Sequence, residues 1–168
     1  MLDANLENQA NTSEIYRQGF VWNDCHHSTK ELYMINKIFV NLAVKDLDKS
    51  TAFFKALGFS FNPQFTDKTA ACMIISDDIY SMLLTHEKFA AFTKKPIADA
   101  HKSTEVLTAL AVESKARVHE LVDKAIKAGG KEAGEPQDYG FIFGRSFEDL
   151  DGHIWEIFWM DPAHVRNG

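Results

Sequence analysis

Two halves of the chain repeat the same order of hydrophobic patterns. In the first half, residues 37–44 (KIFVNLAV) are apolar and rich in β-branched side chains, which predicts a strand. Residues 47–57 place apolar side chains at helical spacing between Asp46, a capping residue, and Gly58, a residue typical of helix ends, so they predict a helix. Three further strands are predicted at residues 59–65, 70–76 and 79–85.

The second half has the same pattern. Residues 105–112 (EVLTALAV) predict a strand, and residues 115–128 predict a helix with one apolar face, which begins after Ser114 and ends at Gly129. The remaining strands are predicted at residues 131–135, 139–146 and 153–159. The repeated β-α-β-β-β order indicates an internal duplication.

The duplication defines the expected domain organisation. We expect a single domain at residues 34–168, with module one at 34–85, a linker at 86–104 and module two at 105–162. Residues 1–33 are rich in Asn, Gln, Ser and Glu and show no sustained period, so we interpret them as an N-terminal appendage. Because Met34 directly precedes the first strand, an alternative is that translation begins there.

Composition narrows the class of partner. A net charge of -6 over 168 residues would repel a phosphate backbone, so nucleic acid is not expected. No apolar run approaches the roughly 20 residues that cross a bilayer, and the first residues lack a secretory pattern. The two cysteines form no CxxC pair, which fits a reducing cytoplasm.

Two strings resemble a known superfamily. FVNLAVKDLDKSTAFFKALGF resembles the first strand and helix of a vicinal-oxygen-chelate module, and GRSFEDLDGHIWEIFW is similar to its closing hairpin, with Leu150 in place of the usual proline. This superfamily includes glyoxalase I, bleomycin-resistance proteins and extradiol dioxygenases. The resemblance covers residues 34–162 and implies an α+β fold in which two tandem β-α-β-β-β modules form a cupped mixed sheet around a groove, with the helices outside. It also implies a homodimer.

The resemblance also implies where a metal would bind. Superfamily members that chelate a metal take ligands from the first and last strand of each module, and the matching positions here are Phe39, Met82, Leu107 and Glu156. Of these, only Glu156 offers an oxygen or nitrogen ligand, and one carboxylate rarely holds a divalent ion. We therefore expect no cofactor, with a divalent metal (zinc, nickel, manganese or iron) as the alternative.

Strand parity places Glu156 in the predicted groove, since alternate side chains of a strand point to opposite faces. Glu156 is the candidate catalytic group, and the only candidate metal ligand. The alternative is a structural carboxylate held by Arg145, Asn41 or the backbone. In the last strand, Ile154, Glu156 and Phe158 share one face, whereas Trp155, Ile157 and Trp159 share the other, which should pack against a helix.

Further residues are expected to contact a ligand. Asn41 could orient a ligand carbonyl or bond to a neighbouring edge. Phe141 and Phe143 alternate with Tyr139 in a predicted strand that ends near Arg145, and they could line a pocket or belong to the core. The candidate ligand-binding residues are Phe39, Asn41, Tyr80, Met82, Leu84, Leu107, Phe141, Phe143, Arg145, Ile154 and Phe158.

The histidines give a weaker signal. His153 should point away from the groove if its strand is regular, and most of the others should be solvated. Cys25, His26 and His27 form a cluster, but no further ligands stand at suitable spacing, so we interpret it as a chance grouping.

These observations favour a groove that binds a small, partly apolar molecule without a stably bound metal, with Glu156 as its main polar anchor. The competing hypothesis is a metal-dependent lyase or isomerase of the glyoxalase I type, in which a shifted register brings Asn41, His86 or His153 to Glu156. A third is a metal-free enzyme that uses Glu156 as an acid and base.

Overall fold

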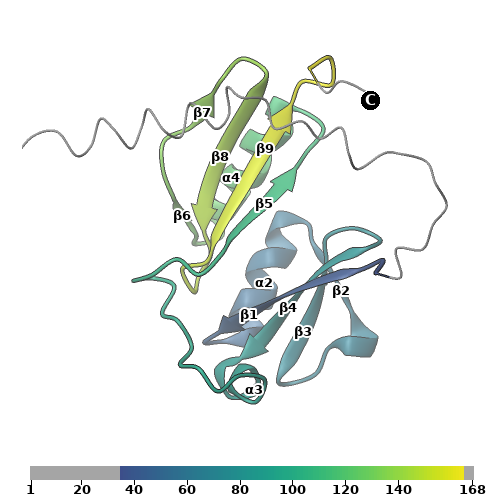
Figure 1. Cartoon of the computed structure of the whole chain (residues 1–168), viewed down its shortest axis with the longest axis vertical. Helices are drawn as coiled ribbons and strands as arrows, with labels where there is room; N and C mark the ends of the chain where they lie inside the picture. The colour runs from purple at the N-terminus through teal and green to yellow at the C-terminus, as the bar shows by residue number, and fades with distance from the viewer. Residues whose placement is uncertain (1–34, 165–168) are drawn as a thin grey trace, which may run out of the picture. The chain divides into compact units, whose positions relative to one another are not determined.

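The computed structural model describes residues 35–164, and the predictions for residues 1–33 and the Cys25 cluster lie outside this range. Residues 35–160 belong to one compact unit. Its first module runs in the predicted order (Figure 1). The elements are β1 (Ile38–Val44), α2 (Leu47–Leu57), β2 (Ser60–Asn62), β3 (Ala70–Ile74) and β4 (Ile79–Thr85), with a 3-10 helix at Pro63–Phe65 after β2.

The second module repeats this order with one addition, the two-residue strand β7, and a short helix stands in the linker between the modules. The elements of the linker and second module are α3 (His86–Ala90), β5 (Leu107–Ala111), α4 (Lys115–Lys127), β6 (Lys131–Glu132), β7 (Gln137–Asp138), β8 (Ile142–Glu148) and β9 (Ile154–Met160).

The strands form two mixed sheets. The first has the order β1-β4-β3-β2 and the second β5-β9-β8-β6, with β7 also paired to β8. In each sheet the first strand of the module runs parallel to the last, and the remaining pairs are antiparallel. The predicted α+β class with two β-α-β-β-β modules is confirmed, and neither sheet closes into a barrel.

Predicted helix caps are confirmed at both long helices. The Asp46 side chain accepts a hydrogen bond from the backbone N–H of Lys49, and Ser114 does the same for Arg117. Gly58 ends α2 in the left-handed conformation, with φ of 103°. These local signals fix where each helix begins or ends.

Turn residues shorten two predicted strands. Pro63 lacks a backbone N–H for the sheet and begins the 3-10 helix, so the strand predicted at residues 59–65 ends at Asn62. The strand predicted at residues 139–146 begins only at Ile142, because Tyr139 donates its backbone N–H to the Ile142 carbonyl across a turn at Gly140.

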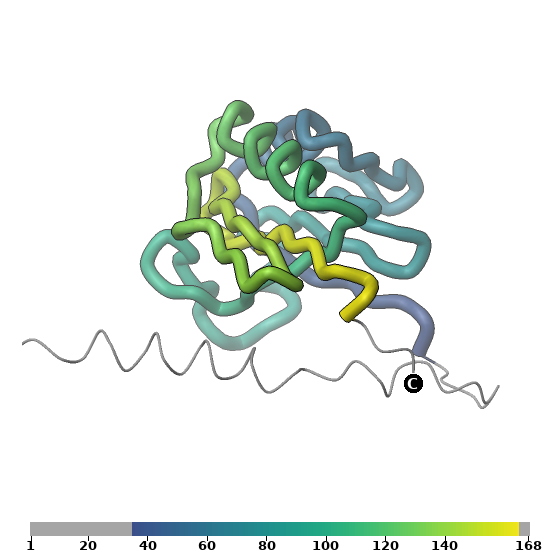
Figure 2. Tube along the Cα trace, turned by 90° about the horizontal axis from the view of Figure 1, so that it is seen from above, coloured from purple at the N-terminus to yellow at the C-terminus, as the bar shows by residue number. Residues whose placement is uncertain are grey.

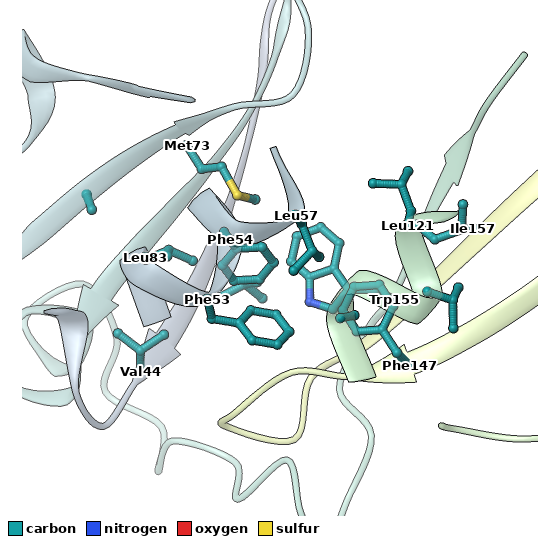
Figure 3. Packing of buried hydrophobic residues seen from close by; sticks show 14 of the residues in the cluster. Val44, Phe53, Phe54, Leu57, Met73, Leu83, Leu121, Phe147, Trp155 and Ile157 are labelled. Atoms are coloured by element: carbon teal, nitrogen blue, oxygen red, sulfur yellow. The ribbon is translucent and has the colours of Figure 1, made fainter. Parts of the chain in front are cut away.

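The two modules share one core (Figure 3). The ring of Phe53 in α2 lies 6.1 Å from the ring of Phe147 in β8, measured between centroids. The ring of Phe54 in α2 lies 5.1 Å from that of Trp155 in β9. Helices α2 and α4 also contact each other. Since residues of both modules bury the same cluster, neither module has a complete core by itself.

The long helices and the linker lie on different sides of the sheets. Figure 2 shows α2 and α4 above the strands and the linker with α3 below them. Helix α3 packs against β1 and β4. Each sheet therefore has a face covered by the long helices and an opposite face. This opposite face is called the helix-free face below because neither α2 nor α4 covers it, although α3 covers one end of it in module one.

Candidate functional site

The strand register shows which residues lie on the helix-free face of each sheet. Residues directly opposite one another in three neighbouring strands form a row across the sheet. In module one, Asn41, Met82 and Cys72 form such a row. In module two the matching row is Ala109, Glu156 and Ser146, at the same place in the register. The duplication therefore extends to individual positions on the two faces.

The predicted parity of the last strand is confirmed. Trp155 and Ile157 are buried in the shared core beneath the helices. The Lys115 ammonium of α4 lies 5.4 Å from the centre of the Trp159 ring, on the same side. Glu156, one position out of phase with these residues, lies on the helix-free face between Ile154 and Phe158.

Small residues flank Glu156 on both sides. Ala109 of β5 and Ser146 of β8 lie directly opposite it. Ala109 is exposed, whereas Ser146 and Glu156 are partly buried. Because neither neighbour rises above the carboxylate, the side chain of Glu156 is accessible from the helix-free side.

The Glu156 carboxylate makes no hydrogen bond or ion pair with any residue in the range 35–164. The alternative that Arg145 holds it is wrong, because Arg145 lies on the opposite face of the sheet. Its guanidinium donates to Asp123 at 2.7 Å and to Glu132 at 2.8 Å. An anionic group on a largely apolar face with no cation beside it can attract a cationic or hydrogen-bonding ligand.

Two predicted ligand contacts are corrected by the register. Arg145 was expected in the groove with Glu156, and Phe143 either in a pocket or in the core, but both lie opposite buried or helix-facing residues, Ile157 and Trp159, and therefore face α4. Phe143 belongs to the shared core. Phe141, expected in the same strand, lies in the segment before β8.

On module one, the candidate residues gather on the helix-free face as expected. The rings of Phe39 and Tyr80 stack with centroids 4.8 Å apart, and Lys37 lies 5.3 Å from the centre of the Tyr80 ring. Asn41 is exposed beside them. Leu84 also lies on this face but is only 3% exposed, because α3 packs over this end of β1 and β4.

The four superfamily metal positions lie on the two helix-free faces but provide a poor donor set. Phe39 and Met82 are on module one, and Leu107 and Glu156 are on module two. A phenyl ring and an isobutyl group have no lone pairs, and a thioether prefers soft metals. Among the described residues, no three His, Cys, Asp or Glu side chains are grouped so that they could hold a metal ion. These residues do not fit a hard or borderline divalent ion.

The structure adds residues that sequence reasoning missed. Ser146 adjoins Glu156, Glu148 lies one row away on the same face opposite Ile154, and Gly144 lies opposite Phe158. Their signal was present in the sequence, since small and polar residues at 144, 146 and 148 alternate with Phe143 and Phe147. The face of β8 with the two phenylalanines is the buried one.

A buried network holds the turn that leads into β9. The Asp149 carboxylate accepts hydrogen bonds from the backbone N–H groups of Asp151 and His153 and from the Trp155 indole at 3.0 Å. The His153 ring lies 3.1 Å from the same carboxylate and is only 5% exposed. These bonds position the strand that carries Glu156.

The His153 ring is buried rather than solvated or turned toward Glu156. Burial by itself lowers the pKa of His153, but the hydrogen bond and charge of Asp149, together with the charges of Asp151 and Glu105, raise that pKa above the usual value. His153 is thus a structural partner of Asp149. His86 begins α3 and is exposed.

The same turn joins the two modules. One oxygen of Asp151 accepts a hydrogen bond from the backbone N–H of Lys45 at 2.8 Å, and the other accepts one from the Ser50 hydroxyl at 2.9 Å. Gly152 packs so closely on the linker that an added Cβ would lie 2.7 Å from the backbone nitrogen of His101. Module one and the linker therefore both fix the start of β9.

Comparisons with known proteins agree with this architecture. A family model described as bleomycin resistance protein-like N-terminal matches residues 37–76. The structure of a hypothetical protein from S. aureus is similar, with 31% sequence identity, a TM-score of 0.62, and coverage of 86% of this chain and 98% of that one.

More distant structures share the fold. A glyoxalase/bleomycin resistance protein/dioxygenase family enzyme from Burkholderia phytofirmans has 19% identity and a TM-score of 0.61, covering 73% of this chain and 96% of that one. The fosfomycin resistance protein FosX from Mesorhizobium loti has 14% identity and a TM-score of 0.54, covering 81% and 97%. Among curated proteins, none matches the chain.

None of the helices in residues 35–164 has the length and apolar character needed to span a membrane. The duplicated register, the matching family model and the similar structures agree on one assignment. The chain belongs to the vicinal-oxygen-chelate superfamily, as a glyoxalase/bleomycin-resistance-like protein.

Proposed function

We propose that the helix-free face of module two binds a small, partly apolar molecule, with Glu156 as its polar anchor and without a stably bound metal. The observation that carries the proposal is the Glu156 carboxylate, which is partly buried among Ile154, Phe158 and two small neighbours and has no partner among the described residues. Apolar side chains beside one polar group are typical of small-molecule sites.

The charge of the anchor indicates the chemistry of the ligand. A carboxylate only accepts hydrogen bonds, so its complement is a donor, and a cationic nitrogen is the strongest such partner. Glu148, on the same face, adds a second negative charge. The ligand that fits this face combines an apolar body with an amine or another N–H group.

The alternative of a metal-dependent lyase or isomerase has less support. It requires further ligands beside Glu156, and His153 is instead held by Asp149. Phe39, Met82 and Leu107 offer no hard donor at the superfamily positions. Sequestration or sensing of a small molecule needs only the binding face.

The test is an NMR titration of the full chain, labelled with ¹⁵N, with phenethylamine and with phenethyl alcohol, which differ in the charged group. We expect phenethylamine to bind about threefold or more tightly, with the largest amide shifts at Ala109, Ser146 and Phe158. In Glu156→Gln this preference should disappear while the alcohol binds as before.

The matched control is Glu135→Gln, which changes net charge equally at an exposed position of module two. It should keep the preference for the amine. Equal affinity for both probes in the wild type, or an unchanged preference in Glu156→Gln, would overturn the proposal.

A further inference from the structure

Gly144 stands in the middle of β8, where no structural requirement for glycine is present. Its φ is outside the left-handed region. The pairing of Ile142–Glu148 with β9 is continuous, so β8 has no bulge on that side. On its other side the register shifts by two residues between β6 and β7, but the extra residues lie in the segment 133–136 and not in β8, so Gly144 is not a bulged residue. A Cβ added to Gly144 would lie 3.5 Å from the Cβ of Phe158 and 3.6 Å from the Ile157 carbonyl oxygen, which are ordinary contacts.

Other glycines of the module are required by packing. An added Cβ at Gly130 would lie 2.7 Å from the Glu148 carbonyl oxygen, and Gly152 is equally close to the linker. A glycine inside a strand costs stability and, where neither bulge nor packing explains it, marks a place that a ligand or another chain segment approaches. Gly144 fits this description.

Gly144 belongs to a row that α3 covers in module one and that none of the helices in residues 35–164 covers in module two. The row in module one is Ala43, Leu84 and Ala70, and all three are buried where α3 packs on β1 and β4. The matching row in module two is Ala111, Phe158 and Gly144. Ala111 is exposed and the other two are partly exposed.

Within this row, Phe158 is the one large side chain. Its neighbours on both sides are alanine and glycine, so both sides of the ring are free of tall side chains. Glu156 lies two positions earlier on the same face of β9, at a distance of about 7 Å along the strand. A molecule the size of an arylalkylamine can reach both residues.

We infer that Gly144 and Ala111 determine specificity by leaving the Phe158 ring open to the flat aromatic part of a ligand whose cationic nitrogen lies at Glu156. The inference rests on the proposed function and names its ligand class, an aromatic amine. Aromatic rings prefer offset-stacked or edge-to-face contact, which side chains larger than alanine at these positions would obstruct.

The first arm of the test compares phenethylamine with cyclohexylethylamine, which has the same charge but a puckered ring. In the ¹⁵N NMR titration of the full chain, we expect phenethylamine to bind about two- to tenfold more tightly. Without a ring contact, the more apolar cyclohexyl compound would bind equally well or better. That result would overturn the inference.

The second arm uses Gly144→Val, with Ser60→Val at an exposed strand position of module one as the matched control. Gly144→Val should lower the affinity for phenethylamine about fivefold or more without lowering the melting temperature, and Ser60→Val should bind as the wild type does. Unchanged affinity in Gly144→Val, or a marked loss of its thermal stability, would show that the glycine has no role in ligand approach.

The two proposals fail in different ways. If only the inference fails, the wild type still prefers phenethylamine to phenethyl alcohol but does not distinguish the flat ring from the puckered one. If the proposed function fails, the preference for the amine is absent. The molar mass of Gly144→Val in solution, measured by light scattering, should equal that of the wild type. A different mass would mean that the row of Ala111, Phe158 and Gly144 contacts a second copy of the chain, and it would overturn the inference.

Discussion

Ser146 lies directly opposite Glu156 in the pairing of β8 with β9, at the position where Cys72 lies opposite Met82 in module one. The two modules thus keep one register but differ in chemistry. Cys72 is fully buried, and this burial raises the pKa of its thiol, which keeps it protonated. Of these two pairs, only Ser146 and Glu156 carry oxygen groups, so the ligand chemistry is expected in module two.

Asp149 is predicted to be the largest single polar contributor to the stability of module two. Asp149→Ala leaves the Trp155 indole and two backbone N–H groups without their acceptor in a buried turn. We expect a loss of about 3 kcal/mol or more in the free energy of unfolding, measured by urea denaturation. Asp78→Ala, which removes an exposed ion pair with Lys37, should lower the free energy of unfolding far less, because solvent screens exposed charges.

His153 should make stability depend on pH. Because the folded-state pKa of His153 is raised above its usual value of 6.5, the protonated ring stabilises the fold. That contribution is fully present below pH 6.5 and is lost as the pH rises through the folded-state pKa. The stability advantage of the wild type over His153→Gln should therefore shrink with rising pH in urea titrations. An advantage that grows with pH would contradict this assignment.

The two kinds of glycine in module two should respond oppositely to alanine. Gly130→Ala forces a Cβ against the Glu148 carbonyl oxygen and should cost about 1 to 3 kcal/mol. Gly144→Ala fits the space and should leave stability unchanged or raise it by up to about 1 kcal/mol. Calorimetric melting of the two variants measures the difference, and equal losses would show that β8 is packed more tightly than described.

The modules should unfold together. Phe54→Ala in α2 removes a ring that packs on Trp155 of the other module, and we expect a loss of about 3 to 5 kcal/mol. Circular dichroism and tryptophan fluorescence should report the same urea midpoint in the wild type and in this variant. Separate midpoints would mean that each module has its own core.

The module order and the face of Glu156 were predictable from the sequence, because helix caps and the alternation of Trp155, Glu156 and Ile157 are local signals. The face of Arg145 was not predicted correctly. Arg145 alternates with Tyr139, Phe141 and Phe143 in a strand predicted to begin at residue 139, and these aromatic side chains resembled a pocket lining, whereas the observed strand begins at Ile142. Counting back from the Asp151 turn places Arg145 opposite the buried Ile157 and would have corrected it.

Burial of Leu84 could not be read from β4 itself. The face on which Leu84 lies was predicted correctly from the alternation of β4. Leu84 is buried because α3 of the linker packs over it, and only tertiary packing places that helix on this side of the sheet. The open row of module two was missed for the same reason, because it is recognised by comparison with the covered row of module one.

Binding of an organic ligand at module two requires a Glu156 carboxylate that is not already bound to a metal. The direct test is the metal content of tag-free protein by mass spectrometry, as purified and after incubation with zinc, nickel, manganese or ferrous iron and desalting, for the wild type and Glu156→Ala. We predict substoichiometric metal, equal in both proteins. Near-stoichiometric metal in the wild type that is lost in Glu156→Ala would contradict the account and favour a metal-dependent lyase.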